Sequence, residues 1–103
     1  MVCPVTPLAA TLTEKEFQAQ VVQLAKILGW KVQFHWRSFH SPAGWPDLTL
    51  VRRDRIIHAE LKTQTGKVSD KQQEWLDALT ATGKCEVHVW RPADFDMLTE
   101  VLR

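Results

Sequence analysis

Cysteine is scarce in this sequence, which limits the roles open to it. Only Cys3 and Cys85 occur among the 103 residues, and neither belongs to a C-x-x-C pair or to a cysteine–histidine spacing typical of zinc sites. The four histidines also lack metal-ligand spacing. We therefore expect two free thiols in a reducing cytosol, with neither a disulfide nor a zinc ion.

Long apolar runs are missing as well. No stretch approaches the roughly 20 apolar residues that a membrane-spanning helix requires. The N-terminal segment, with Pro4 and Pro7, has no basic stretch followed by an apolar run and so does not show the pattern of a signal peptide. We expect a cytoplasmic protein that does not associate with membranes, in which residues 1–10 form an extended arm.

The sequence also lacks an excess of positive charge. Thirteen lysines and arginines face twelve acidic residues, for a formal net charge of +1. Proteins that bind nucleic acid are usually more basic, so any basic surface must be local and balanced by acidic residues elsewhere. Five tryptophans and a hydrophobic fraction of 45% indicate a packed globule, and we expect residues 11–103 to form one domain.

Hydrophobic periodicity predicts an α/β fold. Helices are expected over 14–28, 70–82 and onward from Pro92, and strands over 30–37, 47–51, 56–62 and 85–90. The first strands lie close enough for hairpin pairing, whereas the helix over 70–82 provides a crossover to a parallel strand. The sequence therefore predicts a mixed sheet flanked by helices.

The most informative segment is the hairpin formed by the strands at 47–51 and 56–62. With a short turn of even length, Val51 pairs with Ile56, and Asp47 then lies directly opposite Glu60. Side chains alternate along a strand, so both carboxylates share one polar face with Lys62. The other face carries only apolar residues and must be buried: Leu48, Leu50, Ile57, Ala59 and Leu61.

Two opposed carboxylates repel each other, and a divalent cation between them removes that cost. Oxygen-rich sites of this kind suit Mg²⁺, with Mn²⁺ as a substitute. Together with a lysine they provide what metal-assisted phosphodiester hydrolysis needs. The simpler alternative is a solvated hairpin face, since Glu-x-Lys spacing is common on exposed strands. The apolar back face and the Gly-Trp-Pro-Asp entry favour the metal site.

The order of elements and motifs resembles that of the PD-(D/E)XK nuclease superfamily, and within it the VRR-NUC domain, the virus-type replication-repair nuclease. The resemblance covers nearly everything from residue 13 onward and is carried by six segments and Gly83. The segments are 14–18, Leu28-Gly29-Trp30, Gly44-Trp45-Pro46-Asp47-Leu48, Ala59-Glu60-Leu61-Lys62, 69–76 and 87–92. It implies a restriction-endonuclease-like αβββαβ core with an extra C-terminal helix. It also implies a metal-dependent endonuclease, in a bacterial or phage-infected cell.

The resemblance assigns roles residue by residue. It implies that Asp47 and Glu60 bind the metal, with the backbone carbonyl of Leu61 as a further ligand and Glu14 in the outer shell. Lys62 would position or polarise the attacking water and stabilise developing charge.

Helix capping competes with function at two of these positions. Gln72 matches a glutamine of the family near the edge of the active site, yet Ser69 and Gln72 also fit a capping box. Glu14 can form such a box with Thr11, and Glu16 can form one with Thr13. The sequence leaves both readings open for Glu14 and Gln72.

The resemblance also implies the substrate, because stand-alone members cut branched DNA, including four-way (Holliday) junctions, as homodimers. Candidate DNA contacts near the site are Lys67, Lys71, Arg37 and Trp45. No helix-turn-helix or zinc finger is evident, which favours recognition of DNA shape. A sequence-specific restriction-type nuclease and a non-catalytic nucleic-acid-binding module on the same fold are the alternatives.

Five tryptophans in a short chain also suggest apolar surface beyond what the core needs. We expect a homodimer, and the candidate contacts are Trp36, Trp90 and the last helix around Phe95 and Leu98.

Overall fold

The computed structural model describes residues 11–35 and 42–103. Within them the elements follow the order α2 (Glu14–Ile27), β1 (Lys31–Phe34), β2 (Leu48–Arg52), β3 (Arg55–Leu61), α3 (Asp70–Ala81), β4 (Glu86–Trp90), the 3₁₀ turn η1 (Pro92–Asp94) and α4 (Phe95–Val101). This order confirms the predicted αβββαβ core and its extra C-terminal helix. None of the described helices is both long and apolar enough to cross a bilayer.

The four strands form one sheet in the order β1-β2-β3-β4. The first three are antiparallel, and β4 runs parallel to β3 after the crossover through α3. The predicted hairpin register is confirmed, because Val51 pairs with Ile56 and Leu48 pairs with Ala59. Extending this register by one residue sets Asp47 opposite Glu60. The sheet is therefore mixed, as predicted.

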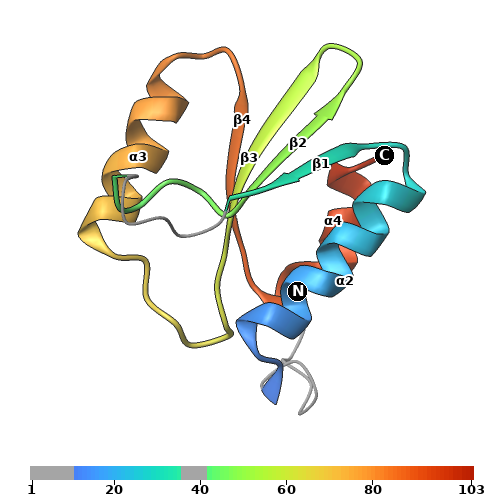
Figure 1. The fold of residues 1–103 in the computed structure, drawn as a ribbon. Coiled ribbons are helices and arrows are strands. Elements are labelled where there is room, and N and C mark those ends of the chain that lie inside the picture. The colour runs from blue at the N-terminus through green and yellow to red at the C-terminus, as the bar shows by residue number, and fades with distance from the viewer. Residues whose placement is uncertain (1–10, 36–41) are drawn as a thin grey trace.

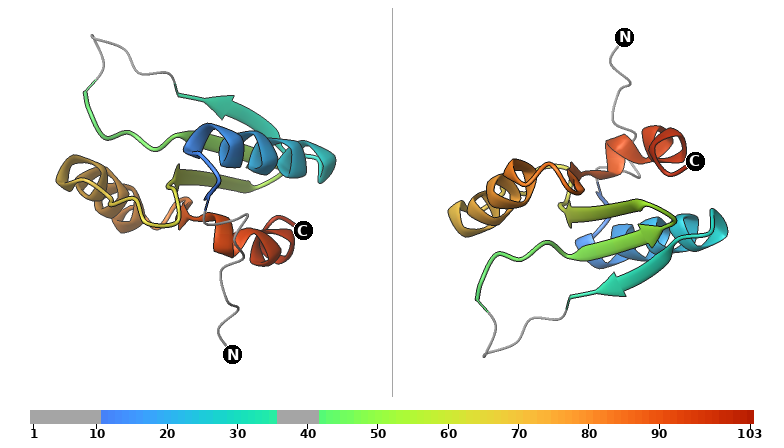
Figure 2. Two further views of the ribbon diagram at one scale, coloured as in Figure 1. Left: turned by 90° about the horizontal axis from the view of Figure 1, so that it is seen from below. Right: turned by 90° about the horizontal axis from the view of Figure 1, so that it is seen from above.

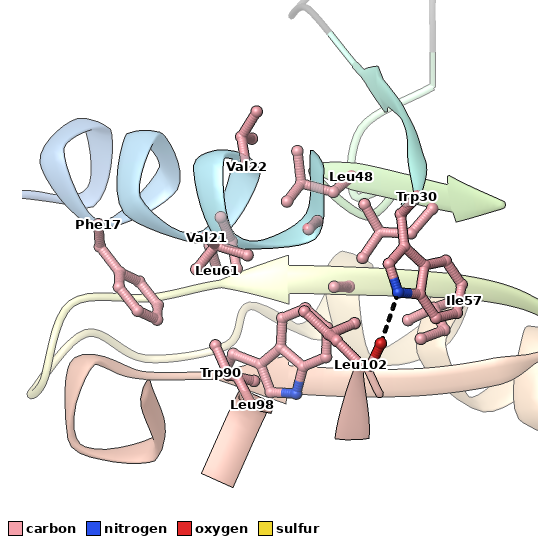
Figure 3. Close-up of a cluster of buried hydrophobic side chains, with 13 residues drawn as sticks. Phe17, Val21, Val22, Trp30, Leu48, Ile57, Leu61, Trp90, Leu98 and Leu102 are labelled. Atoms are coloured by element: carbon pink, nitrogen blue, oxygen red, sulfur yellow. Dashed lines mark hydrogen bonds between the residues drawn. The ribbon is translucent and has the colours of Figure 1, made fainter. Parts of the chain in front are cut away.

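One face of the sheet carries the core. Its strand residues Leu48, Leu50, Ile57, Ala59 and Leu61 are all fully buried, as predicted. Helices α2 and α4 lie together on this side, and α3 stands on the other side (Figures 1 and 2). Figure 3 shows Phe17 and Val21 of α2 in one cluster with Trp90 and Leu98.

Two expected dimer contacts are corrected by this packing. Trp90 is only 1% exposed and Leu98 is fully buried, so both belong to the core of a single chain. They are covered because α4 folds back onto the end of β4, which the local pattern of either element does not reveal. Phe95 is half-buried against the same core, and Trp36 lies outside the described residues.

The two arginines that flank the hairpin turn hold the helix ends. Arg52 Nη1 donates to the carbonyls of Leu28 and Leu102 at 3.0 and 2.8 Å. Its guanidinium lies 4.6 Å from the ring centre of Trp30, and that of Arg55 lies 4.9 Å from it. A cation at the carbonyl end of a helix is favourable, so these contacts fix α2 and α4 against the hairpin.

Candidate active site

The candidate site lies where the start of α2, the start of β2, the end of β3 and the start of α3 meet. Asp47 directly precedes β2, and its Oδ2 accepts a hydrogen bond from the backbone N–H of Leu61 at 2.8 Å. Its carbonyl accepts from the backbone N–H of His35 at 3.0 Å. Asp47 is therefore held by β1 on one side and by β3 on the other.

Three carboxylates converge at this point. Glu14, Asp47 and Glu60 each place one oxygen within 4.8 Å of the others. Oxygens bound to the same Mg²⁺ ion lie at most about 4.2 Å apart, because each Mg–O bond is about 2.1 Å long. A small inward movement would bring the three to one ion. Glu14 reaches the cluster from the first turn of α2, whose own capping box uses Thr13 and Glu16.

Glu60 has the most unusual environment of the three. It is 1% exposed, and burial, followed by the neighbouring Asp47, raises the pKa of Glu60 to about 9. Its Oε2 is buried and has no hydrogen-bond partner among the described residues. An unpartnered buried carboxylate is costly, and a divalent cation between hard oxygen donors would remove that cost. These residues therefore fit a Mg²⁺ or Mn²⁺ ion.

Gln72 forms the capping box and also contacts Glu60. Its Oε1 accepts from the backbone N–H of Ser69 at 2.9 Å, and its backbone N–H donates to Ser69 Oγ at 3.1 Å, which completes a capping box. Its Nε2 donates to Glu60 Oε1 at 3.2 Å. The two ends of one amide thus cap α3 and contact the cluster.

Lys62 lies at the edge of the cluster, directly after β3. Its side chain is 12% exposed, and its Nζ is 3.9 Å from Glu60 Oε1. Its backbone N–H donates to the carbonyl of Trp90 at 3.0 Å, so the end of β4 fixes its position.

The four candidate DNA contacts are placed differently. Lys67 and Lys71 are exposed, the first in the loop between β3 and α3 and the second in the first turn of α3. Trp45 is 36% exposed, and it makes an edge contact with Trp75 of α3 at a centroid distance of 4.9 Å. Arg37 lies outside the described residues.

A chain of hydrogen bonds crosses the polar face beside Asp47. Thr49 Oγ1 lies 2.8 Å from His35 Nε2 and 3.0 Å from His58 Nδ1. Burial lowers the pKa of His35 and of His58, which favours the neutral form of both rings. Trp45 packs edge-on against both, at 5.9 and 5.5 Å. The network joins three strands and supports the loop that carries Asp47.

Trp75 shows where the prediction for α3 was too simple. Apolar spacing along α3 predicts a buried face of Trp75, Leu76 and Leu79, but only Leu76 is buried. Trp75 instead covers Trp45, and its Nε1 donates to the carbonyl of Ala43 at 3.2 Å. The helix therefore holds the loop before Asp47 as well as the sheet.

Sequence reasoning missed the role of Gly44. Its φ is +101°, and a Cβ there would lie 2.5 Å from the carbonyl oxygen of Lys71 and 2.9 Å from the backbone nitrogen of Gln72. Only glycine lets this loop reach the first turn of α3. Its place three residues before Asp47 was the available signal.

The comparisons with known proteins identify the family of the chain. The family model for the VRR-NUC domain matches residues 7–93, and the chain belongs to this family of nuclease domains. It is therefore a nuclease domain of the PD-(D/E)XK type.

Two solved structures share the fold. One, named VRR_NUC domain, is 24% identical, with a TM-score of 0.71 over 84% of this chain and 94% of its own. The other, named VRR_NUC domain protein, is 22% identical, with a TM-score of 0.68 over 88% and 85%. No curated protein matches the chain in sequence.

Proposed function

We propose that this protein is a metal-dependent endonuclease that hydrolyses phosphodiester bonds in branched DNA. The observation that carries the proposal is the convergence of Glu14, Asp47 and Glu60 within 4.8 Å, with Lys62 Nζ 3.9 Å from Glu60, in a member of a nuclease family.

In this proposal Asp47, Glu60 and the carbonyl of Leu61 would hold Mg²⁺, and Glu14 would help to hold the ion or its waters. When bound, the ion supplies charge neutralisation and Lewis acidity at the scissile phosphate. Mn²⁺ substitutes for it, because both ions accept oxygen ligands.

The protein groups then act on the substrate. Lys62 donates to a phosphate oxygen or to the attacking water, and its ammonium stabilises the negative charge that grows on the phosphate in the transition state. Gln72 keeps Glu60 facing the site through its 3.2 Å contact. Water attacks the phosphorus and loses a proton to solvent, the bond between phosphorus and the leaving 3′ oxygen breaks, and a proton from solvent neutralises that oxygen.

DNA is bound by charge and shape. Lys67, Lys71 and Arg37 would contact phosphates and Trp45 a base or sugar beside Asp47. A two-fold homodimer would place two active sites on the two equivalent strands of a four-way junction, and light scattering should then give twice the mass of the chain. Such an enzyme would work where DNA is repaired or recombined, in the cytoplasm of a bacterial or phage-infected cell.

The test is a cleavage assay with labelled four-way junction, fork and linear duplex in Mg²⁺, Mn²⁺ or EDTA. Cleavage of the junction that requires a metal ion supports the proposal. D47N should abolish it, and D54N, which changes an exposed aspartate of the hairpin turn, should not. Defined cuts in plain duplex would favour the restriction-type alternative, and binding without cleavage would favour the non-catalytic one.

A further inference from the structure

Arg91 makes an unusual set of contacts beside the candidate site. It follows β4 directly, and its side chain reaches back to the loop that follows β3. Its Nη1 donates to the carbonyl oxygens of Gly66 at 2.6 Å and Thr63 at 2.8 Å, and lies 3.5 Å from that of Gln64. Three carbonyls from one loop therefore surround a single guanidinium nitrogen. Carbonyl dipoles that converge repel one another, and a cation at their centre removes this repulsion.

No carboxylate in the described part of the chain competes with the loop for the charge of Arg91. Within 11–35 and 42–103 the guanidinium forms no ion pair with a carboxylate. The backbone of Arg91 is also fixed, because its N–H donates to Asp94 Oδ2 at 2.8 Å. The side chain therefore extends from a rigid point, the junction of β4 and η1, and its hydrogen bonds go to the loop.

This loop begins at the residue after Lys62. The chain is thus held on both sides of that lysine: the backbone N–H of Lys62 donates to the carbonyl of Trp90 at 3.0 Å, and the carbonyl of Thr63 accepts from Arg91. A further contact, from the backbone N–H of Ala93 to Gln64 Oε1 at 3.0 Å, ties the loop to η1. Lys62 is the last residue before the loop, so the end of β4 and the loop together determine where its side chain starts.

We propose that Arg91 is the positioning residue for Lys62, and the proposal rests on the role of Lys62 in the proposed function. Arg91 acts by holding the loop at 63–66 closed, which keeps the ammonium of Lys62 beside Glu60 and directed at the substrate. Arg91 does not contact the three carboxylates, so removing it should leave metal binding in place. A misplacement of about 1 Å can cost up to about 100-fold in rate.

The test compares Arg91 with Arg52, which also donates to two backbone carbonyls, at 3.0 and 2.8 Å, but at the ends of α2 and α4. Cleavage of a four-way junction with Mg²⁺ is measured for R91A, R91K, R52A and R52K. The assay temperature lies below the melting temperature of every variant. We expect R91A to lose about 10- to 100-fold in kcat with little change in KM. R91K should retain part of the rate, and millimolar ethylguanidinium should restore part of it to R91A. R52A should lose stability without losing kcat.

Two readouts do not depend on cleavage. Mn²⁺ affinity of R91A, measured by calorimetry, should stay within about threefold of wild type, because the carboxylates are intact. Hydrogen exchange should accelerate at the amides of 62–66 in R91A and not in R52A. A wild-type protein that binds Mn²⁺ but cuts none of the DNAs would end the proposed function, while hydrogen exchange would still decide whether Arg91 holds the loop. Unchanged kcat in R91A, or unchanged exchange at 62–66, would overturn the role of Arg91.

Discussion

The side-chain amide of Gln72 joins helix α3 to the buried carboxylate of Glu60. Its Nε2 donates to Glu60 Oε1 at 3.2 Å, and its Oε1 accepts from the backbone N–H of Ser69 at 2.9 Å. Because both ends of the amide are occupied, a rotation of the side chain would break the helix cap and the contact with Glu60 together. The first turn of α3 and the candidate metal site are therefore one structural unit.

The first prediction separates the two tasks of Gln72. Q72E keeps an oxygen for the cap, since glutamate also serves in capping boxes, but it replaces the donor facing Glu60 with a second acceptor. We expect cleavage to fall about 10- to 100-fold while the melting temperature in Mg²⁺ changes little. Q72A should lose both cap and contact. Wild-type cleavage by Q72E would show that Gln72 serves only as a cap.

The second prediction concerns the residues closest to the chemistry. D47A, E60A and K62A should each reduce junction cleavage by more than the roughly 10- to 100-fold that an outer-shell residue typically contributes. Each should still fold and bind the junction, because DNA affinity comes mainly from phosphate contacts. Gel-shift assays in Ca²⁺ and circular dichroism measure binding and folding. Cleavage by D47A or E60A above a mock preparation would refute the assignment.

The third prediction follows from the pKa of Glu60, which burial raises from 4.5 to about 9. Between these values the folded, metal-free protein holds a proton that the unfolded chain has released. Stability in EDTA should therefore fall as pH rises from 5 to 9, by at most about 1.4 kcal/mol per pH unit for this one group. Below pH 4.5 the group contributes no such penalty. Thermal melts of wild type and E60Q should diverge across this window, with E60Q the more stable at high pH.

Metal ions should lower the raised pKa of Glu60. A divalent cation favours the ionised form of Glu60, so its binding at pH 7 should release close to one proton. Titration of Mn²⁺ in two buffers of different ionisation enthalpy counts that proton. E60Q should release almost none, and E74Q, which changes an exposed glutamate of α3, should behave as wild type. If the melting temperatures of wild type and E60Q in EDTA changed with pH in the same way, that result would contradict the raised pKa of Glu60.

The hairpin could be predicted because its information is local. Alternation along 47–51 and 56–62 fixes which residues face inward, and a short even turn fixes the register that sets Asp47 opposite Glu60. The approach of Glu14 came from the family resemblance, since no spacing rule links the first turn of a helix to a strand that follows much later in the chain.

The missed features all depend on contacts between distant segments. Arg91 binds carbonyls 25 and 28 residues earlier in the chain. Because every residue has a backbone carbonyl, the sequence does not indicate which carbonyl will be the partner. The sequence identifies Trp90 as a strand residue, but it does not show that α4 covers this side chain. Apolar side chains alone could not show whether they fill the core or a dimer surface.

The fourth prediction tests the loop before Asp47. In G44A the new Cβ would lie 2.5 Å from the carbonyl oxygen of Lys71, in a backbone conformation with φ of +101°. G83A is the matched control, because Gly83 also has a positive φ, +64°, but its Cβ would meet nothing within 4 Å. Both should lose about 1 kcal/mol from backbone strain. Only G44A should also displace the first turn of α3 and so lose cleavage. Equal activity of the two variants would show that the loop can move without disturbing Gln72.

The last prediction concerns the choice of substrate. The described residues near the site offer exposed lysines for phosphates, Lys67 and Lys71, and the sequence contains no recognisable element for reading bases in the major groove. Cleavage should therefore follow the shape of the DNA, with a four-way junction cut in preference to its own linear arms. Changing the sequence at the centre of the junction should shift the cut positions only slightly. K67A should weaken binding to every DNA by a similar factor and reduce the salt dependence of affinity by about one phosphate contact. The control is K84A, which changes an exposed lysine in the turn between α3 and β4. K84A should change neither quantity. Efficient cutting of plain duplex at one defined sequence would instead identify a restriction-type enzyme with the same metal site.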